Sequence, residues 1–351
     1  MTNILQSKAW ADFQTALGHT VLHGEGQGFS WQATVEGNST GRYLYTPYGP
    51  IADSPQAFDA ALDSLKAAAH EHGCWFVRVE PAFAQIQDGL ETPEAALRRR
   101  GLKIAPRQVQ PGHTQIIDLD RDEDAILKDM KSTKRNLHRN IHKKGVTFTP
   151  STDPQDVAVL LKYLDQTAER KNFNRQQDDY LRTAAEVLVP QGAGVLYIAR
   201  LDGEPIGAAF AYDSDDTRTY AHAAMDSTHR KLSAGSALVV RMIVDAREKG
   251  LKHFDLFGTA PEGAGPEHEW YGFTKFKQEF GGEPVAYPGT WDLPVSPAKY
   301  AAYMGIRGAR ESVSTAKTKA PALVAGLREK APGALSGLKQ KARSVTKRRS
   351  S

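Results

Sequence analysis

The chain has 351 residues, with 45 Lys and Arg, 41 Asp and Glu, and a formal net charge of +4. Its 40% hydrophobic and 25% charged residues are typical of a soluble globular protein and exclude a fibrous or disordered one, and the length predicts about two domains. The single cysteine, Cys74, excludes an internal disulfide and a multi-thiolate metal site, and we expect its side chain to pack in the core. The lack of disulfides also predicts a cytoplasmic protein.

The first half of the chain begins with a predicted hairpin, followed by an alternation of helices and strands. The hairpin turns at Gly37 and Asn38, and the helix that follows has the apolar spacing of an amphipathic helix. The predicted elements, in chain order, are strands 28–35 and 41–47, helix 55–72, strand 74–79, helix 92–101 and strand 114–118.

A basic segment at 122–144 reads DEDAILKDMKSTKRNLHRNIHKK and is predicted to be one helix. Acidic residues in its first turn and basic residues toward its end match the helix dipole. Its basic residues recur at intervals of three and four and would share one broad face: Lys131, Lys134, Arg135, His138, Arg139, His142 and Lys143. That face is either a phosphate track or an ordinary solvated helix surface.

The second half repeats the order of elements found in the first. Two strands flank a tight Asp202-Gly203 turn, and a helix then leads into a final strand. The predicted elements are strands 194–200, 206–212 and 218–225, helix 236–249 and strand 253–257. We therefore expect an α/β (α+β) fold of two related units, each with a mixed, mostly antiparallel sheet, although no residue-level repeat is visible.

The C-terminal segment 311–351 holds ten Lys or Arg and two acidic residues, so the remaining chain carries about −4. Such a basic tail is either a flexible solubilising segment or a contact to an anionic partner such as RNA or a lipid surface. The N-terminal residues show no secretory signal pattern, and no segment approaches the roughly 20 apolar residues that span a bilayer. Any membrane contact is therefore expected to be peripheral.

Common catalytic signatures are missing from the sequence. It has no His-Glu-x-x-His, Gly-x-x-x-x-Gly-Lys-Ser/Thr or Gly-x-Ser-x-Gly motif, and its scattered histidines give no reason to expect a metal site. The segment Leu232-Ser233-Ala234-Gly235-Ser236-Ala237 is similar to the pyrophosphate loop of acyl-CoA N-acyltransferases, except that Leu232 replaces a polar residue. The alternative is a helix start capped by Ser233 or Ser236.

Residues 254–292, rich in glycine, aromatic and charged side chains, are typical of a loop around a site. They include FDLFG at 254–258, FTKFKQEFGG at 273–282 and YPGTWD at 287–292, and further pieces are QSKAW at 6–10, YGP at 48–50 and KSTKRN at 131–136. In these pieces and their order, the chain resembles the FemABX family of aminoacyl-tRNA-dependent peptidoglycan peptidyltransferases over roughly residues 5–310. The short region 154–189 resembles the compact, FemX-like subgroup, which lacks a long helical hairpin.

The resemblance implies two tandem GNAT-like (acyl-CoA N-acyltransferase) domains. The expected ranges are 1–150 for the first domain, 151–292 for the second, 293–310 for a segment returning to the first, and 311–351 for the basic tail. It also implies an aminoacyltransferase without a cofactor, whose partners are aminoacyl-tRNA and a peptidoglycan precursor, either UDP-MurNAc-pentapeptide or lipid II. Its place would be the cytoplasm, at or near the inner face of the plasma membrane.

The resemblance also suggests site residues. Lys277 matches the lysine of the family's Phe-Lys motif and is the candidate catalytic residue, whose ammonium would stabilise a tetrahedral oxyanion. Arg175 matches an arginine that would bind a precursor diphosphate. Lys131, Lys134, Arg135 and Arg139 are candidate tRNA contacts. A family lysine shortly after Trp10 is missing, because Asp12 or Gln14 stands there.

Three further residues are candidates for lining a peptide groove. Tyr48 and Asp53 follow a first-domain strand, and Tyr220 lies on a second-domain strand. Asp53 could accept a proton there, but we expect it to cap the helix that starts near Pro55, and core packing is the preferred interpretation of Tyr220.

Two other classes of function stay open at this point. One is an acyl-CoA-dependent N-acyltransferase, and the other is a nonenzymatic adaptor for RNA or membrane with degenerate domains.

Overall fold

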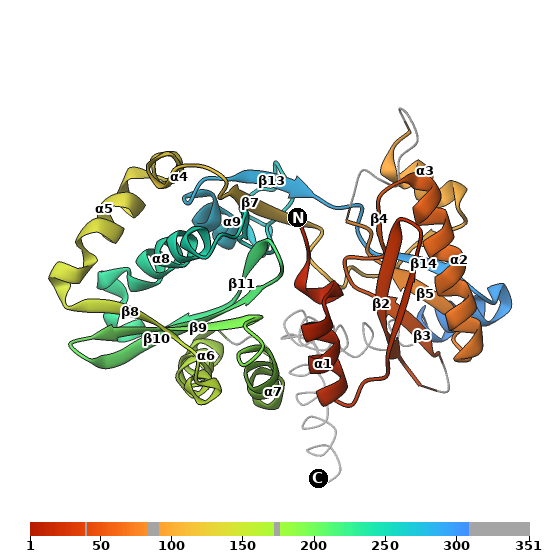
Figure 1. The fold of residues 1–351 in the computed structure, drawn as a ribbon, viewed down its shortest axis with the longest axis horizontal. Helices are drawn as coiled ribbons and strands as arrows, with labels where there is room; N and C mark the ends of the chain where they lie inside the picture. The colour runs from red at the N-terminus through yellow and green to blue at the C-terminus, as the bar shows by residue number, and fades with distance from the viewer. Residues whose placement is uncertain (39–40, 83–90, 172–175, 309–351) are drawn as a thin grey trace, which may run out of the picture. The chain divides into compact units, whose positions relative to one another are not determined.

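Two seven-stranded sheets form the framework of Met1–Val295 in the computed structural model (Figure 1). The structure describes residues 1–38, 41–82, 91–171 and 176–308. Cys74 is buried in the first core, as predicted. Arg175 and the basic tail lie outside the described residues.

The first sheet has the strand order β1-β2-β3-β5-β14-β6, and β4 pairs with β2. Its strands are β1 (Val21–Gly26), β2 (Phe29–Glu36), β3 (Tyr43–Thr46), β4 (Ile51–Ala52), β5 (Phe76–Val79), β6 (Lys103–Ile104) and β14 (Trp291–Pro294). All pairs are antiparallel except β3 with β5. The helix α2 (Pro55–Glu71) connects this parallel pair and packs its apolar face on β1 and β2.

Side-chain caps fix the starts of the first helices. The hydroxyl of Ser7 accepts from the Trp10 amide at the start of α1 (Lys8–Ala16), and Ser54 does the same for α2. Thr92 caps α3 (Pro93–Arg99). In α2 and α3 a proline follows the cap, where its missing N–H costs nothing and its fixed φ suits the helix.

The second sheet has the strand order β13-β7-β12-β11-β10-β9-β8. Its strands are β7 (His113–Asp118), β8 (Val146–Ser151), β9 (Gly194–Leu201), β10 (Glu204–Asp213), β11 (Thr217–Met225), β12 (His253–Asp255) and β13 (Glu283–Ala286). The only parallel pair among these strands is β11 with β12, again connected through a helix, α8 (Ala234–Glu248). The predicted class of two mixed, mostly antiparallel sheets is therefore confirmed.

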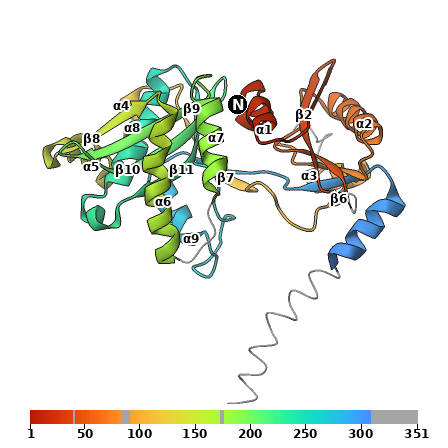
Figure 2. The ribbon, with the colours of Figure 1, turned by 90° about the horizontal axis from the view of Figure 1, so that it is seen from below.

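Helices cover both faces of the second sheet (Figures 1 and 2). On one face α8 packs with α5 (Ser132–Asn140), and on the other lie α6 (Val157–Lys171) and α7 (Asp178–Leu188). The remaining helices are η1 (Ile4–Gln6), α4 (Glu123–Asp129), η3 (Ile141–Lys144), η4 (Pro154–Asp156), η5 (Ser227–Leu232) and α9 (Tyr271–Gln278).

The expected single helix over 122–144 is wrong. It divides into α4, α5 and η3 because Met130 adopts an extended conformation (φ −73°, ψ 153°) and buries its side chain at 2% exposure. The amide of Lys131 then donates to the carbonyl of Glu279 instead of continuing the helix. Tertiary packing thus overrides the local helix preference.

The strands of each sheet do not all come from one of the predicted domain ranges, 1–150 and 151–292. Strands β7 and β8 fall within 1–150 yet pair in the second sheet, whereas β14 returns to pair with β5 and β6 in the first. The domain boundaries themselves stay a prediction.

A second unit begins at Ser296, and its described part holds a helix over residues 297–308. No helix in the described ranges is long and apolar enough to cross a membrane.

Candidate functional site

The parallel strands β11 and β12 separate soon after they pair. Residues 217–219 of β11 pair with 253–255 of β12, and β12 then ends while β11 continues to Met225. Past the end of β12, Phe257 and Gly258 take left-handed conformations, with φ of 53° and 54°. This φ is unfavourable for an aromatic residue, so the surrounding contacts must stabilise the turn.

A bulge in β11 orients side chains toward the gap between these strands. Phe210 of β10 lies opposite His222 and Ala211 lies opposite Tyr220, so Ala221 is the extra residue. Tyr220 therefore faces the α8 side of the sheet, whereas His222 faces the other side and contacts Tyr212.

Lys277 on α9 brings a half-buried ammonium group to this gap. Its Nζ donates to the carbonyl of Phe257 and, at 2.7 Å, to the carbonyl of Gly258. Burial lowers the pKa of Lys277 to about 8, although the nearby Asp255 carboxylate acts in the opposite direction. The group is thus a partly desolvated cation, still mainly protonated at neutral pH.

Asp255 supports the same turn from the end of β12. It is buried, and its carboxylate accepts hydrogen bonds from the Thr114 hydroxyl and, at 2.8 Å, from the Phe257 amide. Burial raises the pKa of Asp255, while both hydrogen bonds and the charge of Lys277 oppose that rise. Asp255 and Lys277 together hold the left-handed turn from its two sides.

A cavity of about 680 Å³ opens beside Lys277, and we call it the lysine cavity. Aromatic side chains form much of its wall, and the small residues Ala221, Ala223 and Gly272 complete it. Its aromatic and charged lining residues are Tyr220, Phe257, Glu269, Phe273, Phe276 and Lys277.

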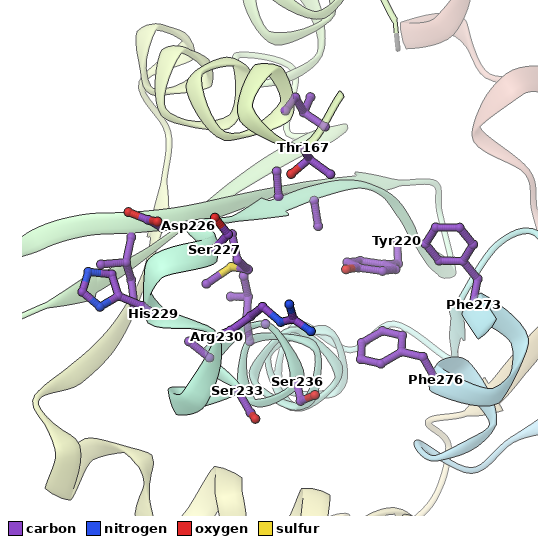
Figure 3. A pocket seen from close by; sticks show the side chains of 18 residues that line it. Thr167, Tyr220, Asp226, Ser227, His229, Arg230, Ser233, Ser236, Phe273 and Phe276 are labelled. Atoms are coloured by element: carbon purple, nitrogen blue, oxygen red, sulfur yellow. The ribbon is translucent and has the colours of Figure 1, made fainter. Parts of the chain in front are cut away.

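A second cavity, of about 600 Å³, adjoins the first, and Tyr220, Phe273 and Phe276 line both. We call it the arginine cavity. Figure 3 shows the Arg230 guanidinium extending into it toward Tyr220 and Phe276. The start of α8 lies along its floor.

The start of α8 is neither a typical pyrophosphate loop nor a helix start capped by a serine side chain. Ser233 is the N-cap residue but makes no side-chain cap bond, and the Ser236 hydroxyl accepts from the Lys134 ammonium at 2.9 Å. The Ser236 amide donates to the carbonyl of Ser233 at 3.0 Å. With that amide in use and Leu232 at the first loop position, the residues fit a coenzyme A pyrophosphate poorly.

Tyr48 is fixed in position and lines neither cavity. Its side chain is 4% exposed, its hydroxyl donates to the carbonyl of Pro111 at 3.0 Å, and its ring packs edge-on against Tyr287. Burial raises the pKa of Tyr48, and the nearby Asp255 carboxylate adds to that effect. Tyr220, in contrast, lines both cavities.

The expected capping role of Asp53 is wrong. The α2 cap is Ser54, whose hydroxyl accepts from the Ala57 amide at 3.1 Å. Asp53 is exposed, and its backbone amide bonds to the carbonyl of Gly28 in the β1–β2 turn.

The basic residues of α5 do not form one exposed track. Lys134 is 9% exposed and bonds to Glu279 and Ser236 over the rings of Phe276 and Phe280. Arg135 donates to the carbonyls of Lys128 and Met130 and so closes the end of α4. Lys131 and Arg139 are exposed, and Lys131 pairs with Glu279 at 2.6 Å.

Three charged residues of these cavities, Asp226, Arg230 and Glu269, were not predicted. None belongs to the pieces that carry the family resemblance. Asp255 and Phe257 do lie in such a piece, FDLFG, but the sequence did not indicate how they hold Lys277. Among the described residues, no group of three or more His, Cys, Asp or Glu side chains could hold a metal ion.

Comparisons with known proteins agree with this architecture. A family model described as an acetyltransferase (GNAT) domain matches residues 128–271. A lipid II:glycine glycyltransferase from Staphylococcus aureus is 23% identical over 222 residues, which cover 60% of this chain and 52% of that protein. The crystal structure of FemX matches with a TM-score of 0.76 and 18% identity, covering 86% of this chain and 94% of that one.

Together these similarities support the expected resemblance to the FemABX family. The two tandem GNAT-like units of the chain confirm the expected fold. The FemABX-like chain is also similar in fold to the C-terminal domain of a putative lysylphosphatidylglycerol synthetase from Agrobacterium fabrum, at a TM-score of 0.53 and 16% identity over 87% of this chain and 92% of that one. The match to the glycyltransferase spans about half of that relative's length.

Proposed function

We propose that the protein is an aminoacyltransferase that moves an amino acid from aminoacyl-tRNA to an amine on the stem peptide of a peptidoglycan precursor. The observation that carries the proposal is the Lys277 ammonium at the wall of a cavity between separating strands. The similarity to a lipid II:glycine glycyltransferase supports a peptidoglycan precursor as acceptor.

The proposed reaction is aminolysis of an ester. The acceptor amine attacks the carbonyl carbon of the aminoacyl group, and the carbonyl oxygen becomes negatively charged. The tetrahedral intermediate then collapses, the bond to the ribose oxygen breaks, and the proton lost by the amine ends on that oxygen as the free ribose hydroxyl. A fixed donor aimed at the developing oxyanion lowers this barrier most directly.

Lys277 is suited to that role by its hydrogen bonds. A lysine ammonium has three N–H donors, and within the described part of the chain two of them are used by the carbonyls of Phe257 and Gly258. The third is left for a substrate oxygen. An aminoacyl ester is already activated, so positioning and charge stabilisation do most of what the reaction requires.

The arginine cavity offers chemistry that suits the nucleotide end of such a donor. The Arg230 guanidinium can bind a phosphate through two parallel hydrogen bonds, and the rings of Phe273 and Phe276 offer faces on which a base can stack. On α5, the exposed Lys131 and Arg139 are the remaining candidates for phosphate contacts, because Lys134 and Arg135 are engaged inside the protein.

Other residues are proposed to bind the acceptor, the peptidoglycan precursor. Tyr48 and Asp53 stay proposed contributors to a peptide groove, and Arg175 stays a proposed diphosphate contact. The basic tail is proposed to hold the enzyme near tRNA or a lipid-linked precursor by charge attraction.

A transfer assay tests the proposal. The protein is given either charged tRNA or acetyl-CoA, each with the same muropeptide precursor. We expect product with charged tRNA, and we expect Lys277→Ala to lower the rate about 100-fold to 1,000-fold because it removes the oxyanion donor. Lys275→Ala is the matched control, since Lys275 is an exposed lysine on the same helix that does not line the lysine cavity.

Two results would contradict the proposal. One is product formation with acetyl-CoA alone. The other is an equal rate for the wild type and Lys277→Ala, which would leave Lys277 as a residue that only holds the turn after β12.

A further inference from the structure

We propose that Glu269 binds the free α-ammonium group of the aminoacyl donor and thereby selects aminoacyl over simple acyl donors. The inference rests on the proposed aminoacyl transfer and assigns a recognition residue to it. It follows from the placement of charge in the lysine cavity.

The lysine cavity contains one side chain of each charge. Among its described lining residues, Glu269 and Lys277 are the two charged ones, and the remainder are aromatic or small. Lys277 is half-buried and Glu269 is exposed, so a ligand can reach the Glu269 carboxylate from solvent while it contacts the Lys277 ammonium. The cavity is therefore suited to a small ligand that carries a positive and a negative centre.

An aminoacyl ester is such a ligand at the moment of reaction. Its α-ammonium lies one carbon from the carbonyl group, and the carbonyl oxygen gains negative charge during attack. With Lys277 facing that oxygen, a carboxylate in the same cavity is the complementary group for the ammonium. An acetyl group has no ammonium and gains nothing from Glu269.

The Glu269 carboxylate is available for this contact. Within residues 1–38, 41–82, 91–171 and 176–308, its side chain makes no ion pair and no hydrogen bond, and it does not pair with Lys277. A substrate ammonium would therefore not have to displace an internal partner.

The backbone on both sides of Glu269 is held in place. The Trp270 amide donates to His268 Nδ1 at 3.0 Å, and the Tyr271 amide donates to the His268 carbonyl at 2.9 Å. The carbonyl of Trp270 accepts from both the amide and the hydroxyl of Thr274 at the start of α9. Glu269 is thus carried on a defined turn rather than on a free loop.

Binding of two matched donor analogues tests the inference. The probes are 3′-deoxy-3′-(L-alanylamido)adenosine and 3′-deoxy-3′-(L-lactylamido)adenosine, which differ in an amino against a hydroxyl group. At pH 6.5 the amine is protonated, since α-amino groups titrate near about 8. We expect calorimetry on the full chain to show the alanyl probe binding roughly 10-fold to 100-fold tighter, as for a hydrogen bond to a charged group.

The variants separate the role of Glu269 from general charge effects. Glu269→Gln should reduce the preference for the alanyl probe to within about 3-fold, because it removes the charge but keeps the shape. Glu267→Gln makes the same change two residues away on an exposed side chain that does not line the lysine cavity, and it should keep the wild-type preference. An unchanged preference in Glu269→Gln would overturn the inference.

Failure of this inference and failure of the proposed function give different results. Transfer from charged tRNA combined with an unchanged probe preference in Glu269→Gln would refute the role of Glu269 alone. A Glu269-dependent preference without any transfer from charged tRNA would support the recognition site and refute the proposed reaction.

Discussion

At the scale of single residues, the protonation state of Lys277 decides what its side chain can do. The two backbone carbonyls that accept from Nζ keep the ammonium in place, while burial lowers its pKa to about 8. A protonated group acts as an oxyanion donor, and a neutral group would act as a base. The pH dependence of the rate distinguishes these two roles.

The rate should lose the contribution of Lys277 as the pH rises. Above about 8 the amine deprotonates, so the donor to the oxyanion weakens. The acceptor amine becomes a better nucleophile as it deprotonates, which raises the rate over the same pH range. The guanidinium of Lys277→Arg stays charged, so the rate of this variant changes with the acceptor amine alone. We expect the ratio of wild-type to Lys277→Arg kcat/KM to fall above pH 8. A ratio that rises to a plateau there would indicate a general base.

The sequence predicted some site residues and could not predict others. Lys277 was predicted from the family resemblance and Tyr220 from its place on a predicted strand, and both line the lysine cavity. Arg230 lies in the short helix η5 before α8, and Glu269 lies in the loop before α9. Their positions depend on tertiary turns, which have no local signature.

At the scale of secondary-structure elements, the separation of β11 and β12 creates the site. The strands pair over three residues, and α9 then enters the gap with Lys277. The bulge at Ala221 sends Tyr220 to the cavity side of the sheet. Long periodic elements such as α2, α8, β9 and β10 agree with the sequence predictions.

Shorter elements were missed for identifiable reasons. Strands β13 and β14 each contain a proline, which is unusual in strands, and β1 has glycines at two of its six positions. The helix break at Met130 could not be predicted either, because its cause is the burial of that side chain beneath distant elements.

A buried ion pair fixes β14 to β5. Arg78 and Asp292 are 1% and 0% exposed and form two hydrogen bonds, at 2.8 and 2.9 Å. Asp292→Ala removes the carboxylate of this buried pair, so we expect chemical denaturation to show a loss of about 3–5 kcal/mol in the free energy of unfolding. Asp12→Ala, which removes the exposed partner of Lys8, should cost less than about 1 kcal/mol. Similar losses in both variants would contradict this account.

At the scale of the whole molecule, the chain builds its two sheets in a discontinuous order. The first sheet takes residues 21–104 and then Trp291–Pro294, and the second sheet takes its strands from the sequence in between. The repeated order of elements predicted two mixed sheets correctly. It could not show that β7 and β8 pair in the second sheet, because pairing between strands far apart in the sequence depends on tertiary contacts.

The most direct measurement of the central claim is mass spectrometry of muropeptides from cells that make the wild type, Lys277→Ala or no protein. We expect an amino acid attached to the stem peptide only with the wild type, because the side chain that stabilises the oxyanion is missing from the variant. The mass difference would also identify the transferred residue. Identical muropeptides from all three cell types would contradict the claim that this protein transfers an amino acid to the cell-wall precursor through Lys277.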